Sequence, residues 1–332
     1  MAETIAKYHH LVPQVYMSAW AQGSGTLKVE FVDNREVIVQ RNKKNIAGIT
    51  NFHSIKAGMP LCKQSDTDLF FAPLANYTVE YAGSILQTTM EMNKKYFDFD
   101  NWTITRADGT PVSKKKIHHE IEQIKLRDIE SNWSIKYENP WKSEVEVIEK
   151  AILQCATDSI PAFDLDFLMR FFTALDWRGF SSNAQFEDAI DFFKGILEDV
   201  DIPEEERILP FARTAWEEMR HYLLLQYYRQ FLNDTGVIFR DAEANLKYTN
   251  FHFLVADGPT LFCTSDTPAF THKRDDEKLI GLLPITPRIL MAKGRCEEDH
   301  AIFYVSHITD DAVKRYNKII GENATEFVVI PW

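Results

Sequence analysis

One long helical block separates two regions of predicted β-structure, and this order limits the folds that the chain can adopt. In residues 113–235, apolar side chains recur at helical spacing in several segments. Both flanking regions instead contain short runs in which apolar and polar residues alternate. A β, then α, then β order favours an α+β fold over a doubly wound sheet, in which strands and helices alternate along the chain.

The helical block divides into five predicted helices. Ser113 is the expected N-terminal cap of the first, and Gly179 is the expected stop of the third. The predicted helices cover residues 113–133, 143–157, 163–175, 184–197 and 204–232.

The β regions contain two predicted hairpins. Residues 26–33 and 36–41 alternate around the turn residues Asp33 to Arg35, and residues 248–256 and 260–265 are joined by Asp-Gly-Pro. Further strands are expected at 279–284, 288–292, 301–306 and 326–330, with a helix at 310–320. The C-terminal region is therefore expected to be mostly antiparallel.

The length of 332 residues favours about two domains. The changes in pattern divide the chain into an N-terminal β region (1–112), a helical region (113–235) and a C-terminal β-rich region (236–332). Within the first of these, residues 57–112 show no sustained period and are interpreted as an inserted elaboration. Whether the three regions fold as one compact unit is left open by the sequence.

The net charge of −12 opposes non-specific binding to nucleic acid, because lysine and arginine supply most of that affinity. A small molecule or a nucleotide is therefore the expected substrate or ligand. The chain has no apolar run long enough to span a bilayer, and its N-terminus lacks the pattern of a secretory signal. We expect a cytoplasmic protein that does not enter the membrane.

The densest group of polar functional side chains lies near the N-terminus, in residues 7–20. His9, His10 and Gln14 alternate there with apolar residues that would anchor the segment in a core, and Pro13 favours an extended conformation before it. Residues 14–20 are predicted to form a short helix. The histidines either belong to a functional site or only satisfy hydrogen bonds in an ordered arm.

A second candidate lies at the end of a hydrophobic strand, in the sequence Phe-Cys-Thr-Ser-Asp-Thr-Pro of residues 262–268. Asp266 is well placed there to face a cleft as a base or a metal ligand. The alternative is an Asx-type turn, in which its carboxylate binds nearby backbone N–H groups. The common phosphate-binding loops, the G-x-S-x-G elbow and H-E-x-x-H are all absent from the sequence.

These two motifs, K-x-H-H-x-V-P-Q-x-Y-x-x-x-W and F-x-T-S-D-x-P, resemble those of an uncharacterised bacterial family, domain of unknown function 4238 (DUF4238). The resemblance covers most of the chain and is weakest in residues 57–112. The matching segments outside the two motifs are residues 44–55, 129–130, 283–287, 317 and 324–329. The chain departs from the family pattern after Arg178, where R-T-P is replaced by Arg-Gly-Phe, and at Thr267, where asparagine is usual.

The resemblance adds Glu130 to the candidate site, because Ile-Glu at 129–130 matches the family pattern. The candidate site then consists of His9, His10, Gln14, Glu130, Arg178 and Asp266. Such a set provides a base, carboxylates that could hold Mg²⁺ or Mn²⁺, and a cation for a developing phosphate charge.

The leading hypothesis is a phosphoester hydrolase, either a nuclease or a nucleotide phosphodiesterase, used in bacterial defence or toxin action. His10 would act as base or metal ligand, Asp266 and Glu130 as metal ligands, and Arg178 as the phosphate contact. A non-catalytic module that binds a small ligand or a protein is the main alternative, with both motifs forming a structural network. A group-transfer enzyme with a diffusible cofactor is the third hypothesis.

Overall fold

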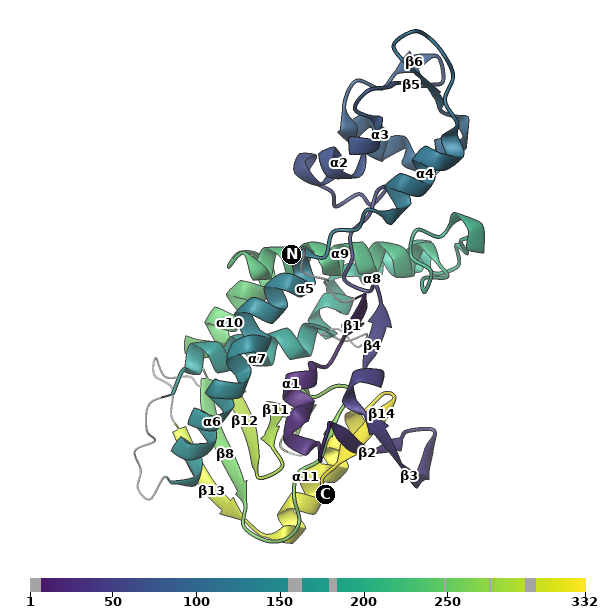
Figure 1. Ribbon diagram of the computed structural model, residues 1–332. Coiled ribbons are helices and arrows are strands. Elements are labelled where there is room, and N and C mark those ends of the chain that lie inside the picture. Colours follow the sequence, from purple (N-terminus) through teal and green to yellow (C-terminus); the bar gives the residue numbers. More distant parts are fainter. Residues whose placement is uncertain are drawn as a thin grey trace. The chain divides into compact units, whose positions relative to one another are not determined.

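The computed structural model describes residues 7–154, 163–178, 184–247, 249–274, 276, 278–295 and 303–332. Helices and mostly antiparallel sheets are both present, which confirms the α+β class (Figure 1). Residue contacts divide the chain into a smaller unit, with residues 53–131 and 188–229, and a larger unit, with residues 6–52, 132–187 and 230–332. The division at residues 112 and 235 stays a prediction, because contacts do not test which segments fold independently.

A five-stranded sheet forms one part of the larger unit. Its order is β10 (Phe270–Lys273), β11 (Leu279–Thr286), β12 (Ile289–Arg295), β8 (Thr249–Ala256) and β13 (Phe303–Ile308). All neighbours are antiparallel except β8 and β13, which are parallel. The strands predicted near residues 280, 290 and 304 are confirmed, and the buried apolar runs of β8 and β11 explain why they lie inside this sheet.

A four-stranded sheet in the order β3 (Asn34–Asn42), β2 (Thr26–Phe31), β14 (Phe327–Ile330), β9 (Thr264–Ser265) forms another part. The β2–β3 hairpin confirms the first hairpin prediction. The second was wrong, because β9 pairs with β14 and not with β8. The backbone of residues 261–263 bonds outside any strand ladder, to the Asn317 side chain and to the carbonyl of Pro287.

The first motif runs through β1 (Tyr8–His10), the short helix α1 (Gln14–Met17) and a 3₁₀ turn at Ser18–Trp20. The predicted helix over residues 14–20 is confirmed in this two-part form. Strand β1 pairs with β4 (Gly48–Thr50). A Cβ atom on Gly48 would lie 2.6 Å from the Tyr8 ring and 2.8 Å from the His9 carbonyl oxygen, so this pairing requires glycine.

Besides α1, the larger unit contains the longer helices α6 (Asn139–Leu153), α7 (Leu165–Arg178), α10 (Gly236–Lys247) and α11 (Asp310–Asn323). The amphipathic α11 places Val313 and Ile320 in a core cluster with Phe262 and Leu290. The helix predicted at 310–320 is thus confirmed. The predicted stop at Gly179 lies outside the described residues.

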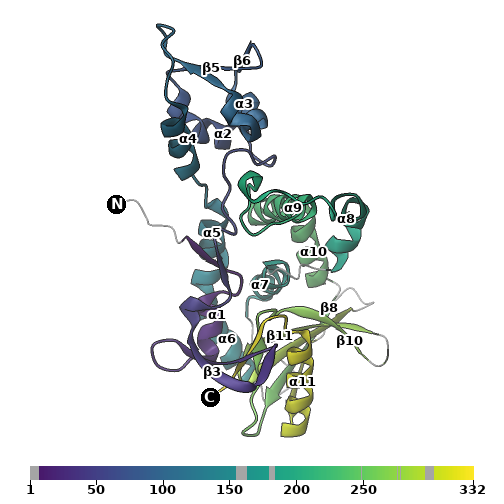
Figure 2. The ribbon, with the colours of Figure 1, turned by 90° about the vertical axis from the view of Figure 1, so that its right-hand side faces the viewer.

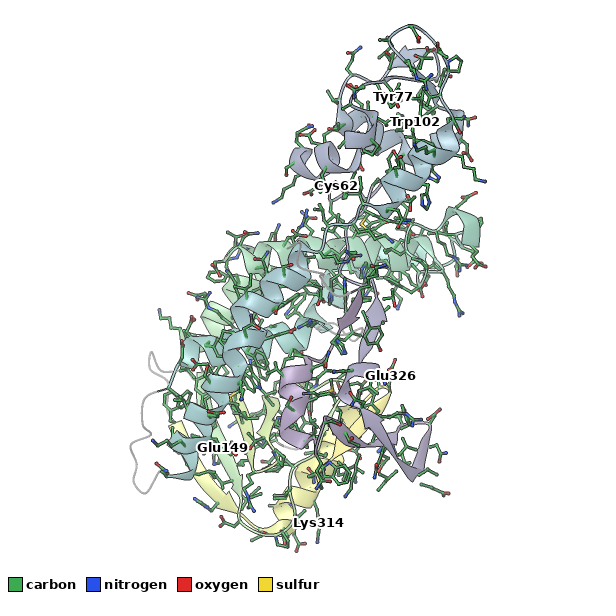
Figure 3. The ribbon with its side chains drawn as sticks, viewed as in Figure 1. Cys62, Tyr77, Trp102, Glu149, Lys314 and Glu326 are labelled. Atoms are coloured by element: carbon green, nitrogen blue, oxygen red, sulfur yellow. The ribbon has the colours of Figure 1, made fainter. Side chains whose placement is uncertain are left out.

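The smaller unit contains a three-stranded sheet, β6 (Ser84–Ile85), β5 (Thr78–Tyr81) and β7 (Thr103–Thr105), with helices beside it (Figure 2). Those helices are α2 (Gln64–Phe70), α3 (Thr89–Lys95) and α4 (Lys114–Gln123). Trp102, labelled in Figure 3, is buried, and its ring centroid lies 4.9 Å from that of Phe99 and 6.1 Å from that of Phe71.

Two helices predicted as continuous are interrupted. The helix expected over 113–133 ends at Gln123, and α5 (Asp128–Trp133) starts anew, because Leu126 between them exchanges backbone hydrogen bonds with Ile55. The helix expected over 204–232 begins only at Ala215, as α9 (Ala215–Leu232), where Thr214 caps it: the Thr214 hydroxyl accepts from the N–H of Glu217, and the Glu217 carboxylate accepts from the N–H of Thr214. The remaining long helix is α8 (Ala184–Leu197).

Among the described helices, none has both the length and the apolar content needed to cross a bilayer.

Candidate functional site

The aromatic residues of the first motif attach it to the second motif. The hydroxyl group of buried Tyr16 donates a hydrogen bond to the carbonyl of Pro284 (2.7 Å) and contacts the Thr264 hydroxyl (2.8 Å). The indole N–H of Trp20 donates to the carbonyl of Phe262 (2.8 Å). Burial raises the pKa of Tyr16 far above its usual range, so the hydroxyl remains a neutral donor. This part of both motifs is therefore a structural connection within the larger unit.

Asp266 of the second motif fixes the start of β14. Its Oδ1 accepts hydrogen bonds from the backbone N–H groups of Thr325 (3.1 Å) and Phe327 (3.4 Å), and its Oδ2 from that of Glu326 (2.9 Å). The Thr325 hydroxyl also donates to Oδ2. The carboxylate thus binds backbone groups about sixty positions further along the chain, and not those of its own turn, as an Asx-type turn would.

Both motifs also line one pocket of about 270 Å³, here called the Asp266 pocket. Tyr8 and Leu11 come from the first motif, Asp266 from the second, and Arg41 and Glu326 are the other charged lining residues. All of these belong to the larger unit. The pocket therefore combines two carboxylates, one guanidinium group and one phenol.

The environment of Glu326 in this pocket favours the neutral form of its carboxyl group more than water does. Burial raises the pKa of Glu326 above its usual value, and the neighbouring charge of Asp266 raises it further. The pKa of Tyr8 is also raised, mainly by burial, with a smaller contribution from Glu326 and an opposing hydrogen bond at Gly48. A carboxyl group whose pKa is raised by burial and by a neighbouring charge is suited to donate a proton.

The two motif histidines lie next to this pocket in sequence. The His10 ring lies edge-on to the Tyr8 ring, with 5.0 Å between their centroids. His10 Nε2 is 3.3 Å from the carbonyl of Lys44, and the Gln14 amide nitrogen lies 3.4 Å from Nδ1. His9 is fully buried. His10 and Gln14 therefore contact each other and do not themselves line the Asp266 pocket, although Tyr8 and Leu11, close to them in sequence, do.

Arg178 is buried in the larger unit and forms an ion pair. Its Nη1 lies 2.6 Å from Oε1 of Glu138, and its guanidinium group lies 5.2 Å from the centre of the Trp133 ring. A guanidinium group held by a carboxylate and an indole is already neutralised. The phosphate contact assigned to Arg178 from the sequence stays a prediction.

Glu130 lies in the smaller unit, where its carboxylate hydrogen-bonds Nδ1 of the fully buried His53. The His53 ring lies edge-on to that of Tyr228, at 5.6 Å. Nearby in sequence, Arg229 binds both Asp66 (2.6 Å) and Asp128 (2.8 Å). A carboxylate that binds one imidazole nitrogen fixes the tautomer, as in many bases and metal ligands. Glu130 therefore has a histidine partner in its own unit.

A family model described as "Protein of unknown function (DUF4238)" matches residues 8–330. The chain belongs to this family. No curated protein and no solved structure matches it.

Sequence reasoning on this DUF4238 protein missed three charged or titratable residues: Arg41, His53 and Glu326. Arg41 is the penultimate residue of an ordinary hairpin strand, so nothing in its local pattern distinguishes it from a solvated charge. His53 and Glu326 both lie in segments that resemble the family, residues 44–55 and 324–329. Those segments were the only available signal, and they gave no reason to choose a single residue.

Proposed function

We propose that this DUF4238 protein is a hydrolase of small phosphoesters and that the Asp266 pocket is its active site. One observation carries the proposal: both motifs line a single pocket that also contains a second carboxylate, Glu326, and a cation, Arg41. Hydrolysis of a phosphoester needs a group that binds phosphate and a group that transfers a proton. The pocket supplies both.

Each charged residue has a distinct role in this proposal. Arg41 binds the phosphate oxygens, since a guanidinium group matches their geometry. Glu326 donates a proton to the leaving alkoxide oxygen while water attacks phosphorus and the bond from phosphorus to that oxygen breaks, and its raised pKa suits that role. The proton that the attacking water loses then returns to the Glu326 carboxylate. Asp266 accepts hydrogen bonds from three backbone N–H groups, one of them that of Glu326, and so keeps Glu326 in position. Its negative charge also adds to the increase in the Glu326 pKa.

The substrate in this proposal is a mononucleotide or a similar small ester. The pocket volume of about 270 Å³ lies just below the roughly 300–1,000 Å³ typical of ligand pockets. The net charge of −12 also disfavours long nucleic acids. Carboxylate oxygens such as those of Asp266 and Glu326 are the ligands that Mg²⁺ and Mn²⁺ prefer, so the reaction is tested with each ion and with EDTA.

The test measures phosphate or alcohol release from nucleotides and from bis(p-nitrophenyl) phosphate. We expect turnover by the wild type and a decrease of about 100-fold or more in kcat for Glu326→Gln, the range typical of a lost proton donor. Arg41→Gln should mainly raise KM. Glu36→Gln, on the same strand as Arg41 and outside the pocket, is the matched control. Equal turnover by Glu326→Gln and the control would refute the assignment.

A non-catalytic module for small ligands is the second candidate, and one observation favours it. Both oxygens of Asp266 already accept hydrogen bonds from the start of β14, so this carboxylate has a full structural role. Calorimetric titration with the same nucleotides separates the two candidates. Binding to the wild type without turnover under any metal condition would favour the module.

A further inference from the structure

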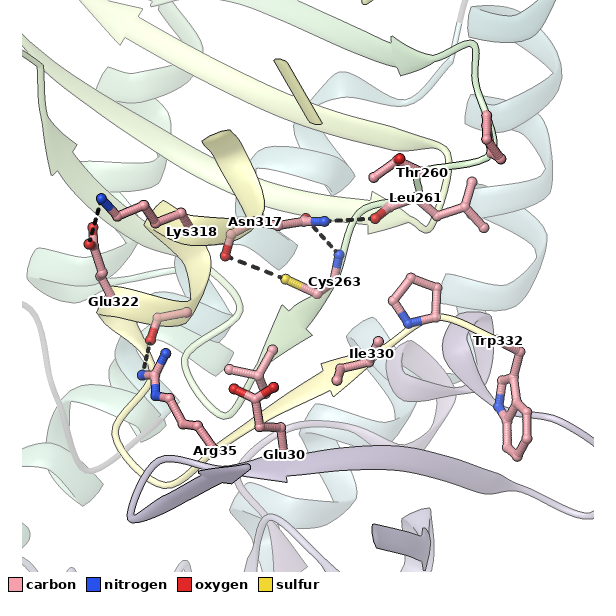
Figure 4. A pocket seen from close by; sticks show the side chains of 14 residues that line it. Glu30, Arg35, Thr260, Leu261, Cys263, Asn317, Lys318, Glu322, Ile330 and Trp332 are labelled. Carbon is pink, nitrogen blue, oxygen red and sulfur yellow. Dashed lines mark hydrogen bonds and ion pairs between the residues drawn. The ribbon is translucent and has the colours of Figure 1, made fainter. Parts of the chain in front are cut away.

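A second, larger pocket of about 550 Å³ lies beside α11 in the larger unit, and it does not overlap the Asp266 pocket (Figure 4). We call it the Arg35 pocket. Its apolar lining includes Leu261, Cys263, Val328 and Ile330, of which Cys263 and Val328 are buried. It can therefore cover an apolar group as well as hold a polar one.

The wall formed by Cys263 is fixed and uncharged. The Asn317 amide donates to the carbonyl of Leu261 (2.8 Å), and its Oδ1 accepts from the N–H of Cys263 (2.9 Å). Burial raises the pKa of the Cys263 thiol to about 12, so it stays protonated at neutral pH. Cys263 therefore contributes apolar surface and not a nucleophile.

Four charged side chains surround the pocket, and two of them neutralise each other. Lys318 and Glu322, one turn apart on the exposed side of α11, lie 3.6 Å from each other. Arg35 at the rim donates from Nη2 to the carbonyl of Gly321 (2.8 Å), and in the described part of the chain no carboxylate pairs with it. Half-buried Glu30 likewise has no cationic partner among the described residues. The pocket thus offers one unpaired cation and one unpaired anion.

We propose that the Arg35 pocket binds a zwitterion with an apolar side chain, either a free α-amino acid or a short peptide. The ligand carboxylate binds the remaining N–H donors of Arg35, and the ligand ammonium group binds Glu30. The apolar side chain lies on Val328 and Ile330. A simple anion would be repelled by Glu30 and a simple cation by Arg35, so opposite charges on one ligand match this pocket best.

The experiment is calorimetric titration of the full chain with four probes. L-leucine and the dipeptide Leu-Phe carry both charges, N-acetyl-L-leucine lacks the ammonium charge, and L-leucinamide lacks the carboxylate. We expect L-leucine or Leu-Phe to bind. Tighter binding of Leu-Phe would identify short peptides as the ligand class, and tighter binding of L-leucine would identify free amino acids. Each singly charged probe should bind at least about tenfold more weakly than the zwitterion, because it loses roughly one charge-assisted hydrogen bond.

Variants locate the binding. Glu30→Gln and Arg35→Gln should each weaken binding by at least about tenfold, whereas the control Lys318→Gln, whose ammonium group pairs with Glu322, should not. Thermal unfolding checks that each variant is folded. If Arg35→Gln does not fold, Arg35→Lys takes its place, because it retains the positive charge but not the guanidinium group. The proposal is overturned if neither zwitterion binds the wild type, or if both bind Glu30→Gln and Arg35→Gln as tightly as the wild type. Because this pocket is separate from the Asp266 pocket, neither result depends on hydrolase activity.

Discussion

The half-buried carboxyl group of Asp176 gives a quantitative prediction about stability and pH. Asp176 on α7 lies near Lys293 of β12 and Asp241 of α10. The Lys293 ammonium group lies 2.9 Å from Oδ1 of Asn245 and 4.4 Å from the centre of the Phe172 ring. One lysine thus faces two aspartates in a buried setting, so the second negative charge is costly.

Burial raises the pKa of Asp176 to about 7; Lys293 opposes this shift, and the charge of Asp241 adds to it. In the unfolded chain an aspartate has a pKa of about 3.9. Between these values the native state holds a proton that the unfolded state has lost, so stability decreases as pH rises from about 4 to 7. A difference of about three pKa units at 1.36 kcal/mol each gives about 4 kcal/mol as the upper limit.

Asp176→Asn tests this reasoning, because asparagine mimics the protonated form at every pH. In urea unfolding, the stability of the variant relative to the wild type should increase by about 2.7 kcal/mol between pH 5 and pH 8, because about two of the three pKa units, at 1.36 kcal/mol each, lie in that range. Asp33→Asn, at an exposed position, is the control and should show no such trend. A difference between variant and wild type that stays constant from pH 5 to 8 would refute the burial argument.

Three further predictions concern the motifs and their pocket. Tyr16→Phe removes the donor to a buried carbonyl and should lower the free energy of unfolding by about 1–3 kcal/mol, as measured with urea. Gly48→Ala places a Cβ atom 2.6 Å from the Tyr8 ring, so it should lower the melting temperature, which scanning calorimetry measures. If Glu326 is the proton donor, the basic limb of the pH–rate profile should lie above the ordinary glutamate pKa. That limb should disappear in Glu326→Gln and move to lower pH in Asp266→Asn, because the variant lacks the charge that raises the Glu326 pKa.

Local patterns predicted those elements whose partners are close in sequence. The hairpin around Asp33 needs only its own alternation and its turn residues, and the helix after Thr309 needs only its own periodicity. Strand β9 was assigned to the wrong partner because β14, to which it binds, lies about sixty residues further along the chain. The break before Asp128 depends on Ile55, which is just as distant in sequence. Sequence periodicity carries no information about such contacts.

The candidate site was only partly predictable for a related reason. A motif marks residues that must be present, but it does not separate those that build the framework from those that face a ligand. In this chain Tyr16, Trp20 and Asp266 all bind backbone groups that hold the two motifs and β14 together. Glu326 has no place in either motif, yet its own backbone N–H donates to Asp266, and both residues line the same pocket. The motif carboxylate therefore fixes the backbone of the residue to which we assign the chemistry and adds to the increase in its pKa that burial causes, and that dependence exists only in the folded chain.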